Sequence, residues 1–198
     1  MAPGARVKLT GRQNIPAGKA VIFMSNHQSY VDIPTLFYMP GQFKWMADEG
    51  LFSIPVFGWA MRMAGYVRVR RGDARAAVRA LNQAKQLLAQ GISVFIFPEG
   101  TRSRTGVMAR FQSGGFRLAQ ETGAPIVPVV VAGTRQLLPR GSWSFRWGVG
   151  LWIDVLPPVP APVSRDEIRP LMGKLRAQMW AAYGRRVKSL ADHVRITA

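Results

Sequence analysis

The sequence predicts an α/β domain built on a largely parallel, mixed β-sheet. Two apolar runs, Ile92 to Phe97 and Ile126 to Ala132, contain no charge, which is typical of strands buried on both faces. Between them, Ser113 to Thr122 is a plausible helix, and the alternation of strand, helix and strand indicates the α/β class. With 198 residues and 48% hydrophobic content, we expect a single domain over residues 1–198, with helices flanking the sheet.

Further elements can be placed in the first half of the chain. Ala20 to Met24 predicts a short buried strand, and Tyr30 to Met39 a helix despite Pro34. Asp73 is a candidate N-cap of a later helix, and Gly91 is a stop signal for it. The apolar stripe expected on that helix consists of Val78, Leu81 and Leu88.

The last part of the chain is expected to form a long amphipathic helix, because its apolar residues recur at helical spacing on roughly one face. These residues are Leu171, Leu175, Met179, Ala182, Val187, Leu190 and Val194. Pro170 leaves the start of this helix open, since proline is tolerated only in a first turn.

The net charge is the strongest compositional signal. It is +17 at pH 7, which indicates an anionic partner, either nucleic acid or anionic lipid. The basic residues are spread along the chain, and residues 62–79 hold six arginines against one acid, Asp73. A solvated surface without a partner is the alternative, but acids are unusually few for it. Charge alone does not separate the two kinds of partner.

The segment Leu51 to Val67 is the best candidate for contact with a membrane. No uncharged apolar run reaches the roughly 18 residues that a spanning helix needs, and the chain start lacks the apolar stretch of a signal peptide. This segment is interrupted by Pro55 and Arg62, yet it is rich in large apolar side chains and is followed by arginines. It suits a position in the membrane interface. An ordinary buried pair of helices is the equal alternative.

The cysteine and histidine counts limit the chemistry. The chain has no cysteine, which excludes disulfides, thiolate metal sites and cysteine nucleophiles. It has two histidines, His27 and His193, and few carboxylates, which disfavours a histidine-rich metal centre. A reaction that needs an imidazole must use one of these two residues.

The first candidate site follows the strand at Ala20 to Met24. His27 and Asp32 lie five positions apart, so on one regular helix their side chains would point about 140° apart. They meet only if the chain turns between them, as in a loop that enters a helix. An aspartate that accepts from one ring nitrogen leaves the other nitrogen free to take a proton, and a substrate hydroxyl can then be the nucleophile. Taken alone, the spacing is more typical of a structural histidine.

The second candidate site, Phe97 to Ser103, follows the other predicted strand, at a sheet edge where ligands gather. Gly100 allows close approach of the backbone, and Arg102 offers a forked donor for phosphate oxygens. Thr101 and Ser103 add hydroxyl groups. By itself, an arginine in a loop is usually only solvated.

Together these stretches resemble the 1-acyl-sn-glycerol-3-phosphate acyltransferase family, within the wider group of glycerolipid acyltransferases. The resemblance covers nearly the whole chain, from about Val7 to the final helix. His27 and Asp32 match the catalytic pair of the family. The residues that match its acceptor-binding block are Glu99, Gly100, Thr101 and Arg102.

Two further blocks strengthen the resemblance. Residues 65–71, Gly-Tyr-Val-Arg-Val-Arg-Arg, look like the family's second block, which places Arg71 at the position of that block's arginine. Residues 127–130, Val-Pro-Val-Val, look like its fourth block. Four blocks in register form a specific signal, and they favour a catalytic role for His27 over a structural one.

The resemblance implies a fold, a reaction and a set of partners. The fold is the single-domain glycerolipid acyltransferase fold. The reaction transfers a fatty acyl group from acyl-CoA or acyl-acyl carrier protein to the sn-2 hydroxyl of 1-acyl-glycerol-3-phosphate, a lysophospholipid. His27 is the general base, Asp32 stabilises the imidazolium, and Arg102 with Arg71 holds the phosphate. No metal or redox cofactor is implied. The expected location is an anionic membrane surface on the cytoplasmic side, as a peripheral or monotopic protein.

Two features depart from the family's pattern. Many relatives have a phosphate-binding lysine before the Leu-Phe-x-Ile-Pro stretch, here residues 51–55, and that position is Asp48. Lys44 lies four residues upstream and is not a direct match. Relatives also commonly carry an apolar N-terminal membrane segment, whereas we expect no transmembrane segment at the start of this chain. The first departure bears on the acceptor head group more than on the reaction.

Three alternatives stand beside this interpretation. An acyltransferase for another lysolipid, such as a lyso-ornithine lipid, would tolerate the loss of the phosphate-binding lysine. A basic nucleic-acid-binding module fits the charge, but no recognised motif supports it and it leaves both site blocks unexplained, so we expect no nucleic-acid partner. A catalytically inert lipid-binding protein is disfavoured by the intact His27 and Asp32.

Overall fold

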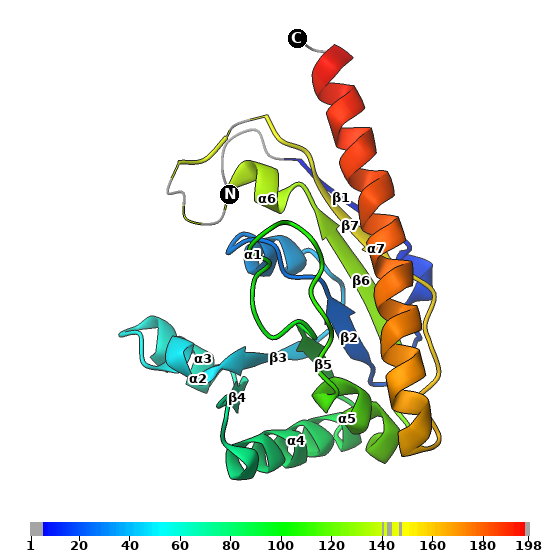
Figure 1. Ribbon diagram of the computed structural model, residues 1–198. Helices are drawn as coiled ribbons and strands as arrows, with labels where there is room; N and C mark the ends of the chain where they lie inside the picture. Colours follow the sequence, from blue (N-terminus) through cyan, green and yellow to red (C-terminus); the bar gives the residue numbers. More distant parts are fainter. Residues whose placement is uncertain (1–5, 140, 142–143, 147, 197–198) are drawn as a thin grey trace.

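A computed structural model confirms the predicted α/β class, with seven strands in one mixed sheet (Figure 1). The structure describes residues 6–139, 141, 144–146 and 148–196, and side chains up to residue 190. The strands are β1 (Val7–Thr10), β2 (Ile22–Ser25), β3 (Phe43–Asp48), β4 (Val67–Val69), β5 (Ser93–Ile96), β6 (Ile126–Ala132) and β7 (Leu151–Val155).

The strand order determines which loops meet. It is β1-β7-β6-β2-β5-β3-β4, and the neighbours from β6 to β4 are all parallel. Only β6 and β7 pair antiparallel, so β1 and β7 run opposite to the other five strands. The carboxyl ends of β2, β5, β3 and β4 therefore lie along one edge of the sheet, where ligands bind in open α/β folds.

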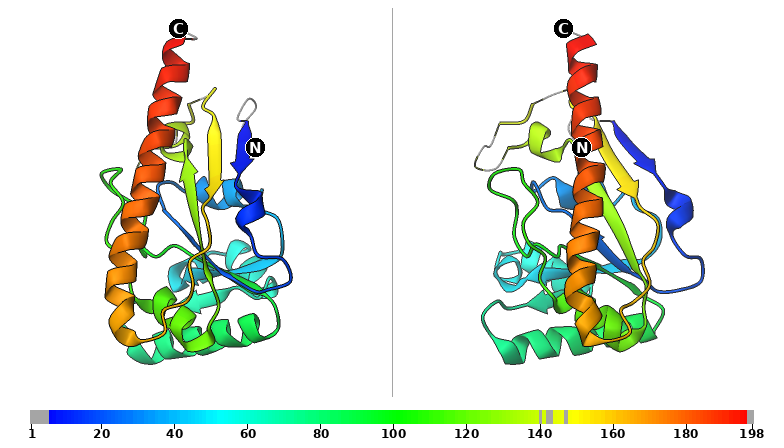
Figure 2. Two further views of the ribbon diagram at one scale, coloured as in Figure 1. Left: turned by 90° about the vertical axis from the view of Figure 1, so that its right-hand side faces the viewer. Right: turned by 45° about the vertical axis from the view of Figure 1, so that its right-hand side comes forward.

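Helices cover both faces of the sheet (Figures 1 and 2). One face carries α4, α5 and α7, whose apolar residues share a core with Ile22 and Met24 of β2. The other carries α1, whose Leu36 packs with Phe23. The helical elements are η1 (Arg12–Asn14), α1 (Asp32–Leu36), α2 (Glu49–Phe52), α3 (Phe57–Met63), α4 (Ala74–Ala89), α5 (Gly114–Thr122), α6 (Thr134–Leu137) and α7 (Arg165–Ile196).

Helix α4 begins where the sequence predicts, but its buried stripe differs. The Asp73 carboxylate accepts from the amide of Ala76 at 2.9 Å, as an N-cap does. The expected stripe is only partly right, because Val78 is exposed. The buried residues are Ala76, Ala80, Ala84 and Leu88, spaced four apart. Small alanines allow this helix to lie close to the rest of the core, so the larger valine can face solvent.

Helix α7 is longer than the apolar pattern indicates. It starts at Arg165 and includes Pro170 rather than beginning after it. Leu175, Met179 and Ala182 are buried against the sheet, as expected from the apolar face. The side chains of Val194 and His193 lie outside the described residues.

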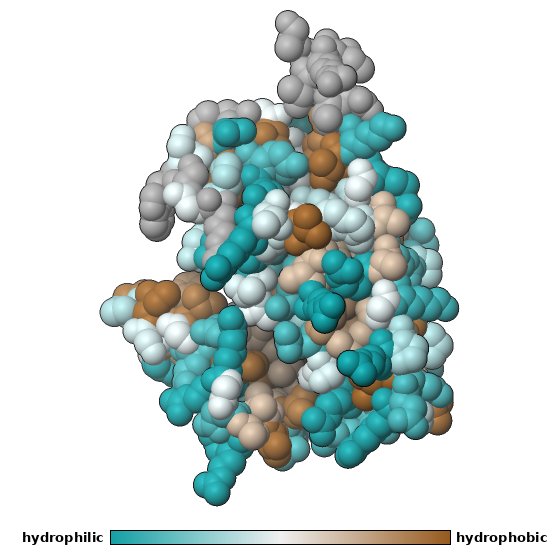
Figure 3. Space-filling model, in the orientation of Figure 1, coloured by the Kyte–Doolittle hydropathy of each residue, from teal (hydrophilic) through white to brown (hydrophobic). Residues whose placement is uncertain are grey.

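Helices α2 and α3 form a short hairpin that projects from the body of the protein (Figure 1). The alternative of an ordinary buried pair of helices is wrong, since Val56 at its tip is 80% exposed and Trp59 is 63% exposed. Figure 3 shows the resulting apolar patch over α2 and α3. Gly58 makes the hairpin possible, because a Cβ there would lie 2.1 Å from the carbonyl oxygen of Phe52.

Candidate active site

Two loops at the shared edge of the sheet carry the candidate site. Strands β2 and β5 are parallel neighbours, so the residues that follow them emerge together. His27 lies two residues beyond the end of β2, and Phe97 directly follows β5. The topology thus brings together two sequence blocks about 70 residues apart.

The chain turns between His27 and Asp32, and their side chains meet. Asp32 is the first residue of α1, and its Oδ2 lies 2.7 Å from His27 Nδ1. The same oxygen accepts from the backbone amides of Gln28 at 2.6 Å and Ser29 at 2.9 Å. Asp32 is fully buried, so these three donors replace the water that its carboxylate gives up. The carboxylate thereby fixes both the loop and the ring.

The His27 ring is held with one nitrogen available. A carboxylate that accepts at Nδ1 places the proton there, which leaves Nε2 unprotonated and able to accept. The ring stacks on Phe97, with centroids 3.9 Å apart and planes 12° apart. The His27 side chain remains 15% exposed. This arrangement is that of a general base oriented by an aspartate, and no serine nucleophile is required when the substrate brings a hydroxyl.

Glu99 holds the loops rather than facing outward. Its Oε1 accepts from the His27 amide at 2.8 Å, and its Oε2 accepts from the Ala109 amide at 2.7 Å. Burial raises the pKa of Glu99, while these two amide hydrogen bonds favour the carboxylate and oppose the rise. The sequence block assigns Glu99 to acceptor binding, whereas the structure directs both of its oxygens to the backbone. These two hydrogen bonds tie the Glu99 carboxylate to the backbone at His27 and at Ala109.

The rest of the second block shapes the loop beside His27. Gly100 has φ +71°, a left-handed conformation that favours glycine. Thr101 is exposed, and the Ser103 amide donates to the His27 carbonyl at 2.8 Å. The guanidinium of Arg102 lies over the ring of Tyr30, 3.4 Å from its centroid. Tyr30 belongs to the His27–Asp32 turn, so this contact joins Arg102 to the turn that carries the candidate base.

Arg71 lies farther along the same edge. It follows β4, which is three strands from β2 in the sheet, a separation of about 14 Å between strand axes. Its Nε forms an ion pair with Asp48 Oδ2 at 3.0 Å. Asp48 also caps α2, because its Oδ1 accepts from the Gly50 amide at 3.0 Å. The structure does not bring Arg71 against His27, and it pairs Arg71 with the Asp48 carboxylate instead.

The supporting roles of three residues are not evident from the sequence. Asn26 anchors the start of the first loop to β6, since its side chain bonds both the amide and the carbonyl of Val131, at 2.8 and 2.9 Å. Tyr183 of α7 is buried in the core that this helix shares with β2. Burial raises its pKa, and the carboxylate of Asp32 adds to the rise. Phe97 stacks on the ring, and its place at the end of a strand was the one signal available.

No group of three or more histidine, cysteine, aspartate or glutamate residues lies close enough to hold a metal ion in the part of the chain that the structure describes. The chemistry that the site offers is a base, an orienting carboxylate and cationic side chains for an anionic group.

The comparisons with known proteins agree on one family. A family model described as Acyltransferase matches residues 6–132. A chloroplastic 1-acyl-sn-glycerol-3-phosphate acyltransferase of Arabidopsis thaliana is 41% identical over 71% of this chain and 40% of that protein. The human 1-acyl-sn-glycerol-3-phosphate acyltransferase alpha is 31% identical over 91% of this chain and 64% of that protein.

A solved structure extends the likeness to the fold. The 1-acyl-sn-glycerophosphate acyltransferase PlsC of Thermotoga maritima is 33% identical, with a TM-score of 0.74. The match covers 94% of this chain and 73% of that one. The chain spans about two fifths of the length of the Arabidopsis relative.

Proposed function

Because the chain belongs to the acyltransferase family that includes the 1-acyl-sn-glycerol-3-phosphate acyltransferases, we propose that it acylates the sn-2 hydroxyl of 1-acyl-glycerol-3-phosphate. The product is phosphatidic acid, and the donor is a thioester. The observation that carries the proposal is the buried Asp32 carboxylate on His27 Nδ1, which leaves Nε2 as an accessible base. Arg102 lies over Tyr30 of the same turn, and its guanidinium can bind an anionic head group.

The proposed reaction follows from the placement of the proton. His27 Nε2 takes the proton of the acceptor hydroxyl while its oxygen attacks the thioester carbonyl. Asp32 stabilises the imidazolium that forms. The C–S bond then breaks, and the imidazolium returns its proton to the departing thiolate. Base catalysis of this kind contributes about 10²- to 10⁴-fold, so positioning and stabilisation of the oxyanion supply the remainder.

A second acceptor is favoured by one observation, the ion pair between Asp48 and Arg71. This pair neutralises a cation at the edge where a phosphate would be bound, so less positive charge is available there for an anionic head group. An acyltransferase for a lysolipid with an amino group, such as a lyso-ornithine lipid, fits this arrangement. Offering the purified protein a thioester donor and a panel of lysolipids, with products identified by mass spectrometry, tests both candidates.

Replacing Asp48 by lysine is expected to shift the acceptor preference toward lysophosphatidic acid. The change removes a negative charge and frees Arg71, so the ratio of kcat/KM for lysophosphatidic acid to that for a zwitterionic lysolipid should rise about 3- to 10-fold. Asp48→Asn is the matched control. Its amide oxygen can still cap α2, so it separates the release of Arg71 from loss of the cap. An unchanged preference in both variants, with phosphate-lipid use abolished by Arg102→Ala, would place Asp48 outside the acceptor site.

The α2–α3 hairpin is the surface that we propose to dock on the membrane. Its exposed apolar residues are Ile54, Val56, Phe57, Trp59 and Met63. None of the described helices is both long enough and apolar enough to cross a bilayer. A patch of this kind can enter the acyl-chain boundary of one leaflet, which would place the protein at the membrane surface from the cytoplasmic side.

Three arginines near the hairpin already form ion pairs with carboxylates of the protein. Arg68 and Arg70 form ion pairs with Glu49, and Arg71 pairs with Asp48. Their net attraction to an anionic head group is reduced accordingly. We therefore expect the apolar residues to contribute more than the arginines to membrane binding.

Replacing Phe57 and Trp59 together by serine should weaken vesicle binding about 10- to 100-fold, because two large apolar groups no longer enter the interface. Flotation with vesicles that contain anionic lipid measures this. Val78→Ser with Val163→Ser is the matched control, because both residues are exposed but lie outside the hairpin. Raising the salt concentration should weaken binding of the unmodified protein more modestly. Equal loss in both double variants would contradict docking through the hairpin.

A further inference from the structure

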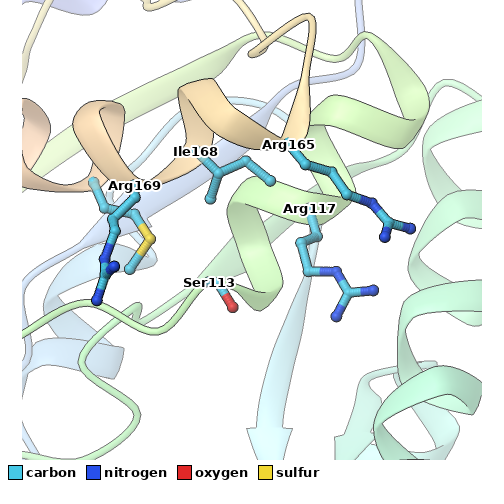
Figure 4. A pocket seen from close by; sticks show the side chains of 6 residues that line it. Ser113, Arg117, Arg165, Ile168 and Arg169 are labelled. Atoms are coloured by element: carbon cyan, nitrogen blue, oxygen red, sulfur yellow. The ribbon is translucent and has the colours of Figure 1, made fainter.

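Helix α7 contributes an arginine that bonds to the backbone of the loop after β5. Two arginines near the start of this helix, Arg165 and Arg169, line a depression between α5 and α7 (Figure 4). Arg176, about two turns beyond Arg169, has a different role. Its Nε donates to the carbonyls of Ala109 at 2.9 Å and Met108 at 3.1 Å, and its Nη2 donates to the Met108 carbonyl at 2.6 Å. One charged side chain therefore binds two successive carbonyl groups.

The backbone around Met108 is fixed to α7 in two ways. The Met108 side chain is fully buried, in the same core cluster as Leu175 and Met179 of α7. Its carbonyl is bonded to the guanidinium of Arg176. Among the described residues, Arg176 has no carboxylate within 4 Å, so its charge is directed at these carbonyls alone. Hydrogen bonds from a charged donor of this kind are stronger than those between neutral groups.

The peptide group between Met108 and Ala109 links Arg176 to the candidate base. Its carbonyl accepts from Arg176, and its amide, that of Ala109, donates to Glu99 Oε2 at 2.7 Å. The other oxygen of Glu99 accepts from the His27 amide at 2.8 Å. A peptide group is planar, so a donor that fixes its carbonyl also fixes the direction of its N–H. A cation at the carbonyl also polarises the peptide and strengthens the N–H bond to the carboxylate.

We propose that Arg176 is a positioning residue for acyl transfer, which acts by fixing the Met108–Ala109 peptide and, through Glu99, the backbone of His27. The inference deepens the proposed function and rests on it. Arg176 does not touch the reacting atoms, and it belongs to none of the four sequence blocks. Its effect is on the place of the base, and a displacement of about 1 Å can lower a rate about 10²-fold.

The test compares Arg176→Gln with Arg186→Gln, a matched control on the same helix. Arg186 Nη2 donates to Asp154 Oδ1 at 2.6 Å, so both variants remove a guanidinium that joins α7 to the rest of the protein. Arg176→Gln should lower kcat about 10- to 100-fold at saturating substrates and change KM for the acceptor within about threefold. Arg186→Gln should unfold at a lower temperature but keep kcat within about twofold while folded.

A double-variant cycle tests the route through Glu99. Glutamine at position 99 has a single acceptor oxygen, so Glu99→Gln breaks one of the two amide bonds and should itself lower kcat. Because Arg176 acts through Glu99, adding Arg176→Gln to Glu99→Gln should lower kcat by less than about threefold more. Additive losses would contradict the proposed route.

Hydrogen exchange followed by mass spectrometry gives a readout that needs no substrate. Arg176→Gln should speed exchange of the amides in residues 104–112 and in residues 26–30, because the bonds at Ala109 and His27 are both loosened. Arg186→Gln should leave exchange in both segments unchanged. Faster exchange in residues 104–112 alone would show that the effect stops before His27 and would contradict the proposal.

Two kinetic results would also overturn it. Unchanged kcat in a folded Arg176→Gln protein would show that the base keeps its place without this arginine. Equal losses of kcat in the Arg176 and Arg186 variants would assign the effect to general loosening of α7. Failure of the proposed function itself looks different, because the unmodified protein would then form no acylated product while the exchange difference between the two variants would remain.

Discussion

Replacing His27 by alanine is expected to lower turnover by about 10²- to 10⁴-fold, because the substitution removes the only base placed at the sheet edge by the described site residues. Binding of the acceptor should change little, so the loss should appear in kcat. The measurement is the initial rate of acyl transfer at saturating donor and acceptor.

The loss of turnover in His27→Ala supports a catalytic role for His27 only if the variant is folded. His27 also stacks on Phe97, so alanine leaves a small gap. His27→Gln fills more of that space without supplying a base, and it should be as inactive as His27→Ala. Thermal unfolding and vesicle flotation should be nearly unchanged in both variants. Near-normal turnover by a folded His27→Ala protein would refute the proposed mechanism.

Replacing Asp32 by asparagine should cost a similar factor or somewhat less, about 10²- to 10⁴-fold in kcat. An amide oxygen at the position of Oδ2 can still accept from Gln28, Ser29 and His27. The amide nitrogen would then replace Oδ1, which has no hydrogen-bond partner among the described residues. The loop should therefore keep its shape, while the imidazolium loses its counter-charge.

Asp32→Ala should differ from Asp32→Asn in its effect on stability. It removes the acceptor of two buried amides, and each unsatisfied group costs about 1–3 kcal/mol. The alanine variant should therefore unfold at a lower temperature as well as lose activity, whereas the asparagine variant should lose activity alone. Near-wild-type kcat for a folded Asp32→Asn protein would show that the carboxylate only holds the loop.

The fold class could be predicted because each central strand is a continuous apolar run in the sequence. Strand β6 coincides with the run Ile126 to Ala132, which is apolar throughout and ends at a glycine. Strands β1 and β7 carry no such signal, because they form at the far edge through pairing between Val7 and Leu151. Such long-range pairing depends on the whole sheet and cannot be read from a short window.

Helix α1 is shorter than the sequence predicts. The sequence predicts a helix from Tyr30 to Met39, but the structure has only Asp32–Leu36. The helix starts at Asp32 rather than Tyr30 because the amides of Gln28 and Ser29 bond the Asp32 carboxylate, which holds residues 28–31 in the turn that brings Asp32 to His27. The functional geometry overrides the local helical preference.

The residues of the candidate site could be predicted from the sequence, but the groups that each side chain contacts could not. Glu99 and Arg102 stand in one block, and both are expected at the acceptor. Only the structure shows that the Glu99 carboxylate accepts from two backbone amides while Arg102 lies at Tyr30. Hydrogen bonds from backbone amides depend on the fold, so they cannot be predicted from the side chains in a sequence block. The partner of Arg71 was equally hidden, because Asp48 meets it only when β3 and β4 pair.

The most direct test of the central claim uses a donor whose acyl chain is deuterated, with 1-acyl-glycerol-3-phosphate as acceptor. Tandem mass spectrometry of the lipid product locates the label. We predict phosphatidic acid with the deuterated chain at sn-2 from the unmodified protein, and at least about 100-fold less from His27→Ala. Label at sn-2 formed equally by both proteins, or no labelled phosphatidic acid from a folded unmodified protein, would contradict base catalysis by His27 on this acceptor.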